Sequence, residues 1–130
     1  MREDQTIRPL SDQNKCFYHK VNGFTVNEKV YVGSCVNHDR YRWDFTQNGQ
    51  IINWNRKWLI PHCITIPDYT NSKKFQQLFL SPCEEGNLNQ SWMVEDGMIK
   101  IKANPLTCLA WNLGDKTRLW SIGCVGLRFS

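Results

Sequence analysis

The string Leu78-Phe79-Leu80-Ser81-Pro82-Cys83, followed by Gln90-Ser91-Trp92 and Gly97-Met98-Ile99, is the second copy of a repeated block. The first copy reads Val30-Tyr31-Val32-Gly33-Ser34-Cys35, then Tyr41-Arg42-Trp43 and Gly49-Gln50-Ile51. A third copy starts at Cys108 and passes through Leu119-Trp120-Ser121-Ile122-Gly123-Cys124. One more cysteine leads each copy: Cys63 follows Cys16 by 47 positions, and Cys108 follows Cys63 by 45. A period of this size indicates a repeated supersecondary unit.

Length and composition indicate one globular domain. The chain has 130 residues, of which 41% are hydrophobic and 22% are charged, and these values exclude a disordered chain. We expect three copies, over about 5–50, 51–98 and 99–130, the last one short. The net charge of +4 is spread along the chain, so the sequence predicts no nucleic-acid partner and leaves room for an anionic small partner.

Six cysteines, an even number, indicate disulfides and an oxidising compartment. Six cysteines allow fifteen pairings, among which the residue types alone do not choose. If each copy folds alike, the cysteines of each copy pair with each other, which predicts Cys16–Cys35, Cys63–Cys83 and Cys108–Cys124. Each bridge would stabilise the fold by about 3 kcal/mol in the chain-entropy account.

Short apolar and aromatic runs separated by turn residues predict an all-β chain. Residues 6–10 are expected to form the first strand of copy one. Asn48-Gly49 and Asp96-Gly97 hold the same place in two copies and predict tight hairpin turns with a positive φ. Three related units favour a barrel with three-fold pseudo-symmetry over a sandwich. No apolar run has the length of a membrane span, so no direct membrane insertion is predicted.

The Gln90-x-Trp92 triplet before Gly97-x-Ile99, and its degenerate form Arg42-Trp43-x-Phe45 before Gly49-x-Ile51, carry a resemblance to a known family. The pattern resembles the ricin B-type (R-type) lectins, and within them the N-terminal cysteine-rich domain of the mannose receptor group. The resemblance covers nearly the whole chain and implies a β-trefoil stapled by the three disulfides. It also implies that three aromatic residues lie in a shared core, one from each copy: Trp43, Trp92 and Phe129.

The resemblance bears on the sugar sites as well. Galactose-binding members have an Asp two residues after the first Cys of a copy, but here those positions hold Tyr18, Thr65 and Ala110. The mannose receptor group places a sulfated-sugar site in its third copy. The corresponding candidates here are a stacking aromatic, a hydroxyl-binding amide, an acidic loop residue and two cations for a sulfate: Trp111, Asn112, Asp115, Lys116 and Arg128. Packing under a loop is an equal alternative for Trp111.

Other candidates are weaker. The segment Trp54–Trp58 holds two aromatics and two cations, and we interpret it as loop and packing residues. The histidines His19, His38 and His62 have no metal-ligand spacing, so we expect them to be solvated at the surface and predict no metal. Asn89 begins an N-glycosylation sequon. No catalytic motif or cofactor fingerprint is present in the sequence, which predicts a protein that is not an enzyme and takes no cofactor.

The leading hypothesis is a non-enzymatic carbohydrate-binding module with a glycan or glycoprotein partner, including sulfated or other anionic glycans. The alternative is a β-trefoil that has lost its sugar sites and binds a protein through its loops, and a third is an accessory domain of an enzyme. Disulfides without a signal peptide predict a mature domain or excised module of a secreted protein or receptor ectodomain.

Overall fold

The computed structural model describes residues 4–20, 28–53, 60–111 and 118–124, and these ranges are almost entirely strands, turns and loops. They contain no α-helix, only two short 3-10 helices. The elements in chain order are β1 (Lys15–Tyr18), β2 (Glu28–Lys29), β3 (Tyr31–Ser34), η1 (Asp39–Tyr41), β4 (Trp43–Phe45), β5 (Ile51–Asn53), β6 (His62–Thr65), β7 (Gln76–Gln77), β8 (Phe79–Pro82), η2 (Leu88–Gln90), β9 (Trp92–Glu95), β10 (Met98–Ile101), β11 (Asn104–Ala110) and β12 (Trp120–Gly123). The all-β expectation is confirmed.

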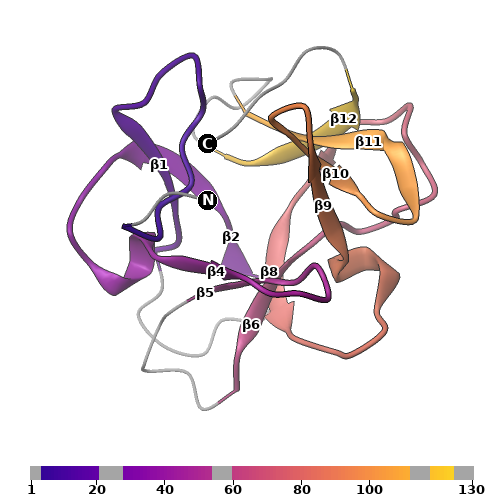
Figure 1. Ribbon diagram of the computed structural model, residues 1–130, viewed down its shortest axis with the longest axis horizontal. Helices are drawn as coiled ribbons and strands as arrows, with labels where there is room; N and C mark the ends of the chain where they lie inside the picture. Colours follow the sequence, from indigo (N-terminus) through magenta and orange to yellow (C-terminus); the bar gives the residue numbers. More distant parts are fainter. Residues whose placement is uncertain (1–3, 21–27, 54–59, 112–117, 125–130) are drawn as a thin grey trace.

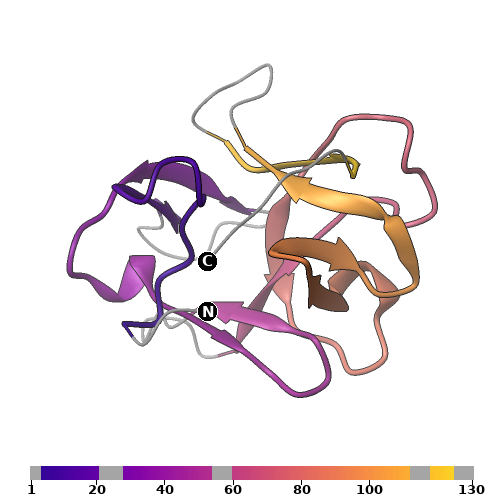
Figure 2. The ribbon, with the colours of Figure 1, turned by 45° about the horizontal axis from the view of Figure 1, so that its top comes forward.

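The same strand pair forms in all three copies, with the same register. The strand that holds the lead cysteine pairs antiparallel with the strand before the second cysteine: β1 with β3, β6 with β8, and β11 with β12. Each lead cysteine lies opposite the residue two before its partner cysteine, as Cys16↔Gly33, Cys63↔Ser81 and Cys108↔Ile122. Figures 1 and 2 show the three copies as lobes around a common centre, the arrangement of a β-trefoil.

The predicted disulfides are confirmed. Cys16 is bonded to Cys35, Cys63 to Cys83 and Cys108 to Cys124, with Cα atoms 5.0, 5.1 and 4.9 Å apart. Each bridge closes one strand pair at the end where the second cysteine leaves the sheet. The fifteen possible pairings therefore reduce to the one that the internal repeat predicts.

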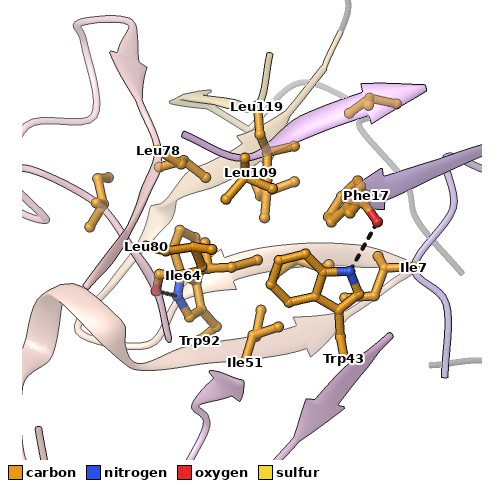
Figure 3. Packing of buried hydrophobic residues seen from close by; sticks show 14 of the residues in the cluster. Ile7, Phe17, Trp43, Ile51, Ile64, Leu78, Leu80, Trp92, Leu109 and Leu119 are labelled. Carbon is orange, nitrogen blue, oxygen red and sulfur yellow. Dashed lines mark hydrogen bonds between the residues drawn. The ribbon is translucent and has the colours of Figure 1, made fainter. Parts of the chain in front are cut away.

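The core holds one tryptophan from each of the first two copies, as expected. Trp43 and Trp92 are buried. Each indole N–H donates to the carbonyl that follows a lead cysteine, Trp43 to Phe17 and Trp92 to Ile64, both at 3.0 Å (Figure 3). A buried tryptophan needs such a partner for its polar N–H. The third aromatic, Phe129, lies outside the described residues.

The copies interlock near the centre through backbone hydrogen bonds. In each copy, a fully buried apolar residue directly precedes the strand that leads to the second cysteine: Val30 before β3, Leu78 before β8 and Leu119 before β12. Leu78 N donates to Leu119 O at 3.0 Å, and Leu119 N donates to Val30 O at 2.9 Å. Strands also pair between copies, β2 with β8 and β7 with β12. The two five-stranded sheets therefore combine strands of different copies, whereas β1 and β3 form a two-stranded sheet within copy one.

Both predicted turns have a glycine with positive φ, but the two turns differ. Asp96 and Gly97 have φ of 54° and 75°, and Glu95 pairs directly with Met98, which is a two-residue hairpin turn. In the other turn only Gly49 is positive, at 89°, and Gly49 N donates to Thr46 O. Thr46 N then donates to Gln50 O, so this loop is one residue longer.

Two expectations from the sequence are wrong. Residues 6–10 form no strand: Pro9 makes only an isolated bridge, and the side chains of Thr6 and Arg8 bind Asp4 and the Gln13 carbonyl. Ile7 still lies in the core, and its carbonyl accepts a hydrogen bond from Phe17 N at 3.0 Å. The second correction concerns His19, which is fully buried and not at the surface.

Candidate functional site

Among the third-copy candidates, the structure describes only Trp111. It follows β11, is half-buried, and packs against the core. Its place, three residues after the lead cysteine, is that of His19 in copy one and Ile66 in copy two, both of which are fully buried. The other candidates, Asn112, Asp115, Lys116 and Arg128, lie outside the described residues, as does the segment 54–58. That the five form one sugar site stays a prediction.

The positions two residues after the lead cysteines differ in the three copies. Ala110 is fully buried and has no polar side-chain atom. Thr65 is 5% exposed, and its hydroxyl accepts from Gln90 Nε2 at 3.2 Å and lies 2.8 Å from Ser81 Oγ. Only Tyr18 is partly exposed. At this position a ligand therefore has access to copy one alone.

In copy two a buried glutamine fills the space under this position. The Gln90 amide is fully buried and accepts from Glu84 N at 2.9 Å. Its Nε2 donates to Ser81 Oγ and to Pro82 O, both at 2.9 Å. The amide thus holds η2 against β8. Because the Gln90 side chain is fully buried, its amide is not accessible to a ligand.

Copy one replaces this network with aromatic rings. Tyr41 stands two residues before Trp43, as Gln90 does before Trp92, and Gly33 stands where copy two has Ser81. Tyr18 takes the place of Thr65, and its ring lies over Gly33, where an added Cβ would come within 2.9 Å of Tyr18 Cε1. Tyr18 and Tyr41 stack with ring centres 4.9 Å apart. The three residues of copy one therefore replace the three residues of the polar network together, because the Tyr18 ring fits only over a glycine.

A third tyrosine and two cations extend this surface. The Tyr31 ring centre lies 5.7 Å from that of Tyr18, Lys20 Nζ lies 4.4 Å from the Tyr31 ring centre, and Arg118 Cζ lies 6.0 Å from it. Arg118 comes from copy three and reaches copy one through a backbone bridge to Tyr31. We call Tyr18, Tyr31, Tyr41, Lys20 and Arg118 the tyrosine surface. The three rings are half-buried, so each presents part of its face to solvent.

The Tyr18 hydroxyl stays protonated at neutral pH. Burial is the main cause that raises its pKa above the ordinary value, and the neighbouring Tyr41 and Tyr31 raise it further. A protonated phenol both donates and accepts a hydrogen bond. The tyrosine surface therefore offers ring faces, hydroxyl groups and two positive charges, and the Glu28 carboxylate lies at its edge, where it accepts from Lys20 N at 3.3 Å.

The described residues contain no group of three or more His, Cys, Asp or Glu side chains arranged to hold a metal ion. All six cysteines are paired in the three disulfides, so none is free. His38 is exposed and accepts a hydrogen bond from Arg40 N at 3.1 Å, so it caps η1. Burial lowers the pKa of His19 to about 4, and the nearby Arg40 contributes less; the hydrogen bond with Asn53 opposes this shift. His19 is therefore neutral at physiological pH.

Asn89, the first residue of the glycosylation sequon, is half-buried in η2. Its side-chain oxygen accepts from Tyr69 N at 3.0 Å. The amide therefore already takes part in joining η2 to the loop after β6. Whether it carries a glycan stays a prediction.

Comparisons with known proteins agree with this geometry. A family model described as "Ricin-type beta-trefoil lectin domain" matches residues 1–92. No curated protein sequence matches the chain. A crystal structure of the Vibrio vulnificus hemolysin/cytolysin β-trefoil lectin with N-acetyl-D-lactosamine bound is similar, with a TM-score of 0.70 and 16% identity over 96% of this chain and 90% of that one.

Two earthworm structures are similar as well. One is the C-half of an R-type lectin in complex with GalNAc, with a TM-score of 0.70 and 14% identity over 96% of this chain and 94% of that one. The other is a lectin C-terminal domain mutant in complex with 6'-sialyllactose, with a TM-score of 0.63 and 14% identity over 97% and 96%. At these identities the likeness shows a shared fold.

Proposed function

Because the chain belongs to the ricin-type β-trefoil lectin domain family, we propose that it is a non-enzymatic carbohydrate-binding module and that the tyrosine surface of copy one contacts the glycan. The observation that carries the proposal is the replacement of a closed polar network in copy two by half-exposed, stacked tyrosines in copy one. The three similar lectin structures hold lactosamine, GalNAc or sialyllactose in their own complexes.

The chemistry of the tyrosine surface favours an anionic glycan. Amphipathic rings such as those of tyrosine offer an apolar face to a sugar and a hydroxyl to its polar groups. Lys20 and Arg118 lie beside these rings and add positive charge, and cations form the stronger hydrogen bonds with sulfate or carboxylate. Because no copy has an Asp two residues after its lead cysteine, neutral galactose is expected to bind more weakly.

We propose a second site, for a sulfated glycan, in the third copy. This part of the proposal follows the likeness to the mannose receptor group, and its residues are Trp111, Asn112, Asp115, Lys116 and Arg128. Two separate sites would matter for avidity, because linked weak sites bind more tightly together than either does alone.

The proposed cellular location follows from the disulfides. Three bridges persist only where the surroundings are oxidising, which favours a secreted protein or a receptor ectodomain. In the described part of the chain, no helix has the length and apolarity needed to cross a membrane.

A glycan array with neutral, sialylated and sulfated ligands tests the proposal. The variant Tyr31→Ala should lose binding, because it removes the ring that both cations face. Phe75→Ala is the matched control, since Phe75 is an aromatic residue of copy two that is 52% exposed. Trp111→Ala addresses the third copy in the same way. Binding that survives Tyr31→Ala and disappears with Trp111→Ala would move the site to copy three.

The alternative is a protein-binding β-trefoil. It is favoured by the burial of Thr65 and Ala110, because a sugar has no accessible acceptor at this position in copies two and three. If folded, fully oxidised protein binds no glycan on the array, this alternative replaces the lectin proposal. A pull-down that is insensitive to free sugars and to deglycosylation of the partner would then identify its ligand as protein.

A further inference from the structure

A hollow lies beside the tyrosine surface. It has a volume of 330 Å³ and separates the N-terminal segment from the turn after β3 and from η1. Small-molecule sites occupy roughly 300 to 1,000 Å³, so this hollow suits one monosaccharide unit. It is lined by Asp4, Thr6, Arg8, Cys35, Val36, Asn37, Tyr41 and Arg42. We call it the arginine pocket.

Both arginines of this pocket are held in place by other groups. Arg42 Nη1 donates to Asp39 Oδ1 at 2.7 Å, and Arg42 Nη2 donates to the Asn37 side-chain oxygen. Arg8 donates to Thr6 Oγ1 at 2.9 Å, to Gln13 O at 2.9 Å and to Asp4 Oδ2 at 2.8 Å. A guanidinium that is fixed before a ligand arrives loses little conformational freedom on binding.

The two guanidinium groups keep unused donors. Each has five N–H bonds. Within the described part of the chain, Arg8 makes three hydrogen bonds and Arg42 makes two. Two donors therefore remain on Arg8 and three on Arg42.

Each guanidinium group of the pocket is paired with a carboxylate. Arg8 pairs with Asp4, which also lines the pocket, and Arg42 pairs with Asp39, which does not. The charges therefore balance, and the attraction for an anion comes from the N–H donors that the two ion pairs leave unused. Planar guanidinium groups with free N–H bonds are the side chains best suited to bind a carboxylate or a sulfate.

We propose that the arginine pocket binds the oxyanion of an acidic sugar, a carboxylate or a sulfate ester, while the adjoining sugar lies on the tyrosine surface. Tyr41 connects the two, because it lines the pocket and stacks on Tyr18. The contact of the adjoining sugar with the tyrosine surface rests on the proposed function. Binding of the oxyanion itself depends on the arginines alone.

Calorimetric titration with three probes tests the specificity: N-acetylneuraminic acid methyl glycoside for a carboxylate, methyl galactoside 6-sulfate for a sulfate, and methyl galactoside as the neutral sugar. We expect the acidic probes to bind about tenfold more tightly, the size of effect that a charged hydrogen-bonded group gives. Whichever acidic probe binds more tightly identifies the source of the oxyanion. Arg42→Gln should abolish the preference, and Lys102→Gln, which removes an exposed charge in another copy, should keep it.

A second variant leaves both ion pairs intact. Val36 lines the pocket and is 53% exposed, so Val36→Glu adds a negative charge at the rim without removing a buried group. It should weaken the acidic probes about tenfold, by repulsion between like charges. The matched control is Val94→Glu on β9, because Val94 is 55% exposed and lies in copy two.

The arginine side chains report binding directly. In an NMR titration with N-acetylneuraminic acid and with inorganic sulfate, the Nε–Hε signals of Arg8 and Arg42 should shift. If neither signal moves, or if acidic and neutral probes bind equally and Val36→Glu has no effect, the pocket proposal is overturned. Sensitivity of neutral-sugar binding to Tyr31→Ala is a separate result, so each proposal fails on its own measurement.

Discussion

Gly49 shows how much one residue can determine. Its φ of 89° is in the left-handed region, and a Cβ at this position would come within 2.6 Å of Trp92 O and 3.2 Å of Trp92 N. Gly49 O accepts from Trp92 N at 2.8 Å, so the turn of copy one packs directly on the backbone of copy two. Two independent constraints, φ and close approach, therefore both require glycine here.

The first prediction concerns these two constraints. Gly49→Ala should lower the free energy of unfolding by at least about 2 kcal/mol, because strain and a backbone clash add. Gly86→Ala should cost only about 1 kcal/mol, the strain of a left-handed alanine, because Gly86 has a φ of 78° and no atom near its Cβ position. Urea denaturation followed by tryptophan fluorescence measures both. Equal losses in the two variants would refute the clash.

His19 gives the second prediction, a dependence of stability on pH. Its pKa is about 4 in the folded protein and 6.5 as an ordinary value, so between these values the unfolded chain binds more protons. The free energy of unfolding should therefore fall as the pH drops from 6.5 to 4, by roughly 3 kcal/mol in total from this group. Above pH 6.5 the contribution is constant.

The comparison with His19→Gln isolates this effect. Glutamine is neutral throughout and keeps a polar group for Asn53, so the variant should lack this part of the pH dependence. Urea denaturation at pH 7.5, 5.5 and 4.5 gives the difference between the two proteins at each pH. A difference that does not change with pH would show that His19 is not buried as a neutral ring.

At the scale of elements, one buried amide joins η2 to β8, and this yields the third prediction. Gln90→Leu leaves Glu84 N and Pro82 O without their partners. Both hydrogen bonds are part-buried, so the loss of these two partners should cost about 1 to 3 kcal/mol of unfolding free energy. Gln50→Leu is the control, because Gln50 makes one exposed hydrogen bond to Glu84 O and its loss should be within about 0.5 kcal/mol.

The elements also show how far the sequence alone could predict this structure. The repeat, the all-β class, the disulfides and the turn glycines follow patterns in the sequence, and each was correct. The N-terminal strand was wrong because Pro9 supplies no N–H and the side chains of Thr6 and Arg8 provide other hydrogen bonds. His19 was misplaced because its residue type indicates a surface, and only its equivalence to the buried Ile66 indicates the core.

The candidate site was harder to predict than the fold. The tyrosine surface assembles side chains from β1, β3, η1, the loop after β1 and one residue of copy three, and none of these has a motif of its own. One signal was present: Tyr18, Gly33 and Tyr41 occupy the positions of Thr65, Ser81 and Gln90. Reading the three substitutions together, with the copies aligned, would have indicated the exchange of a polar network for an aromatic one.

For the whole molecule, the interlocked copies predict cooperative unfolding. The central hydrogen bonds among Val30, Leu78 and Leu119, and the packing of Gly49 on Trp92, tie every copy to a neighbour. Loss of one copy therefore exposes the core of the others. Urea transitions followed by tryptophan fluorescence and by far-UV circular dichroism should coincide, as for a two-state domain. Two separate transitions would mean that one copy unfolds independently.

The order of the cysteines has a consequence for biosynthesis. Each cysteine pairs with the next one along the chain, so every bridge closes before the following copy begins. As these residues emerge from the ribosome, Cys35 meets Cys16 while Cys16 is the sole earlier thiol of this domain, 28 residues ahead of Cys63. The same holds for Cys83 with Cys63, and then for Cys124 with Cys108. Oxidation in the order of translation thus gives the native bridges directly, without a reshuffling step.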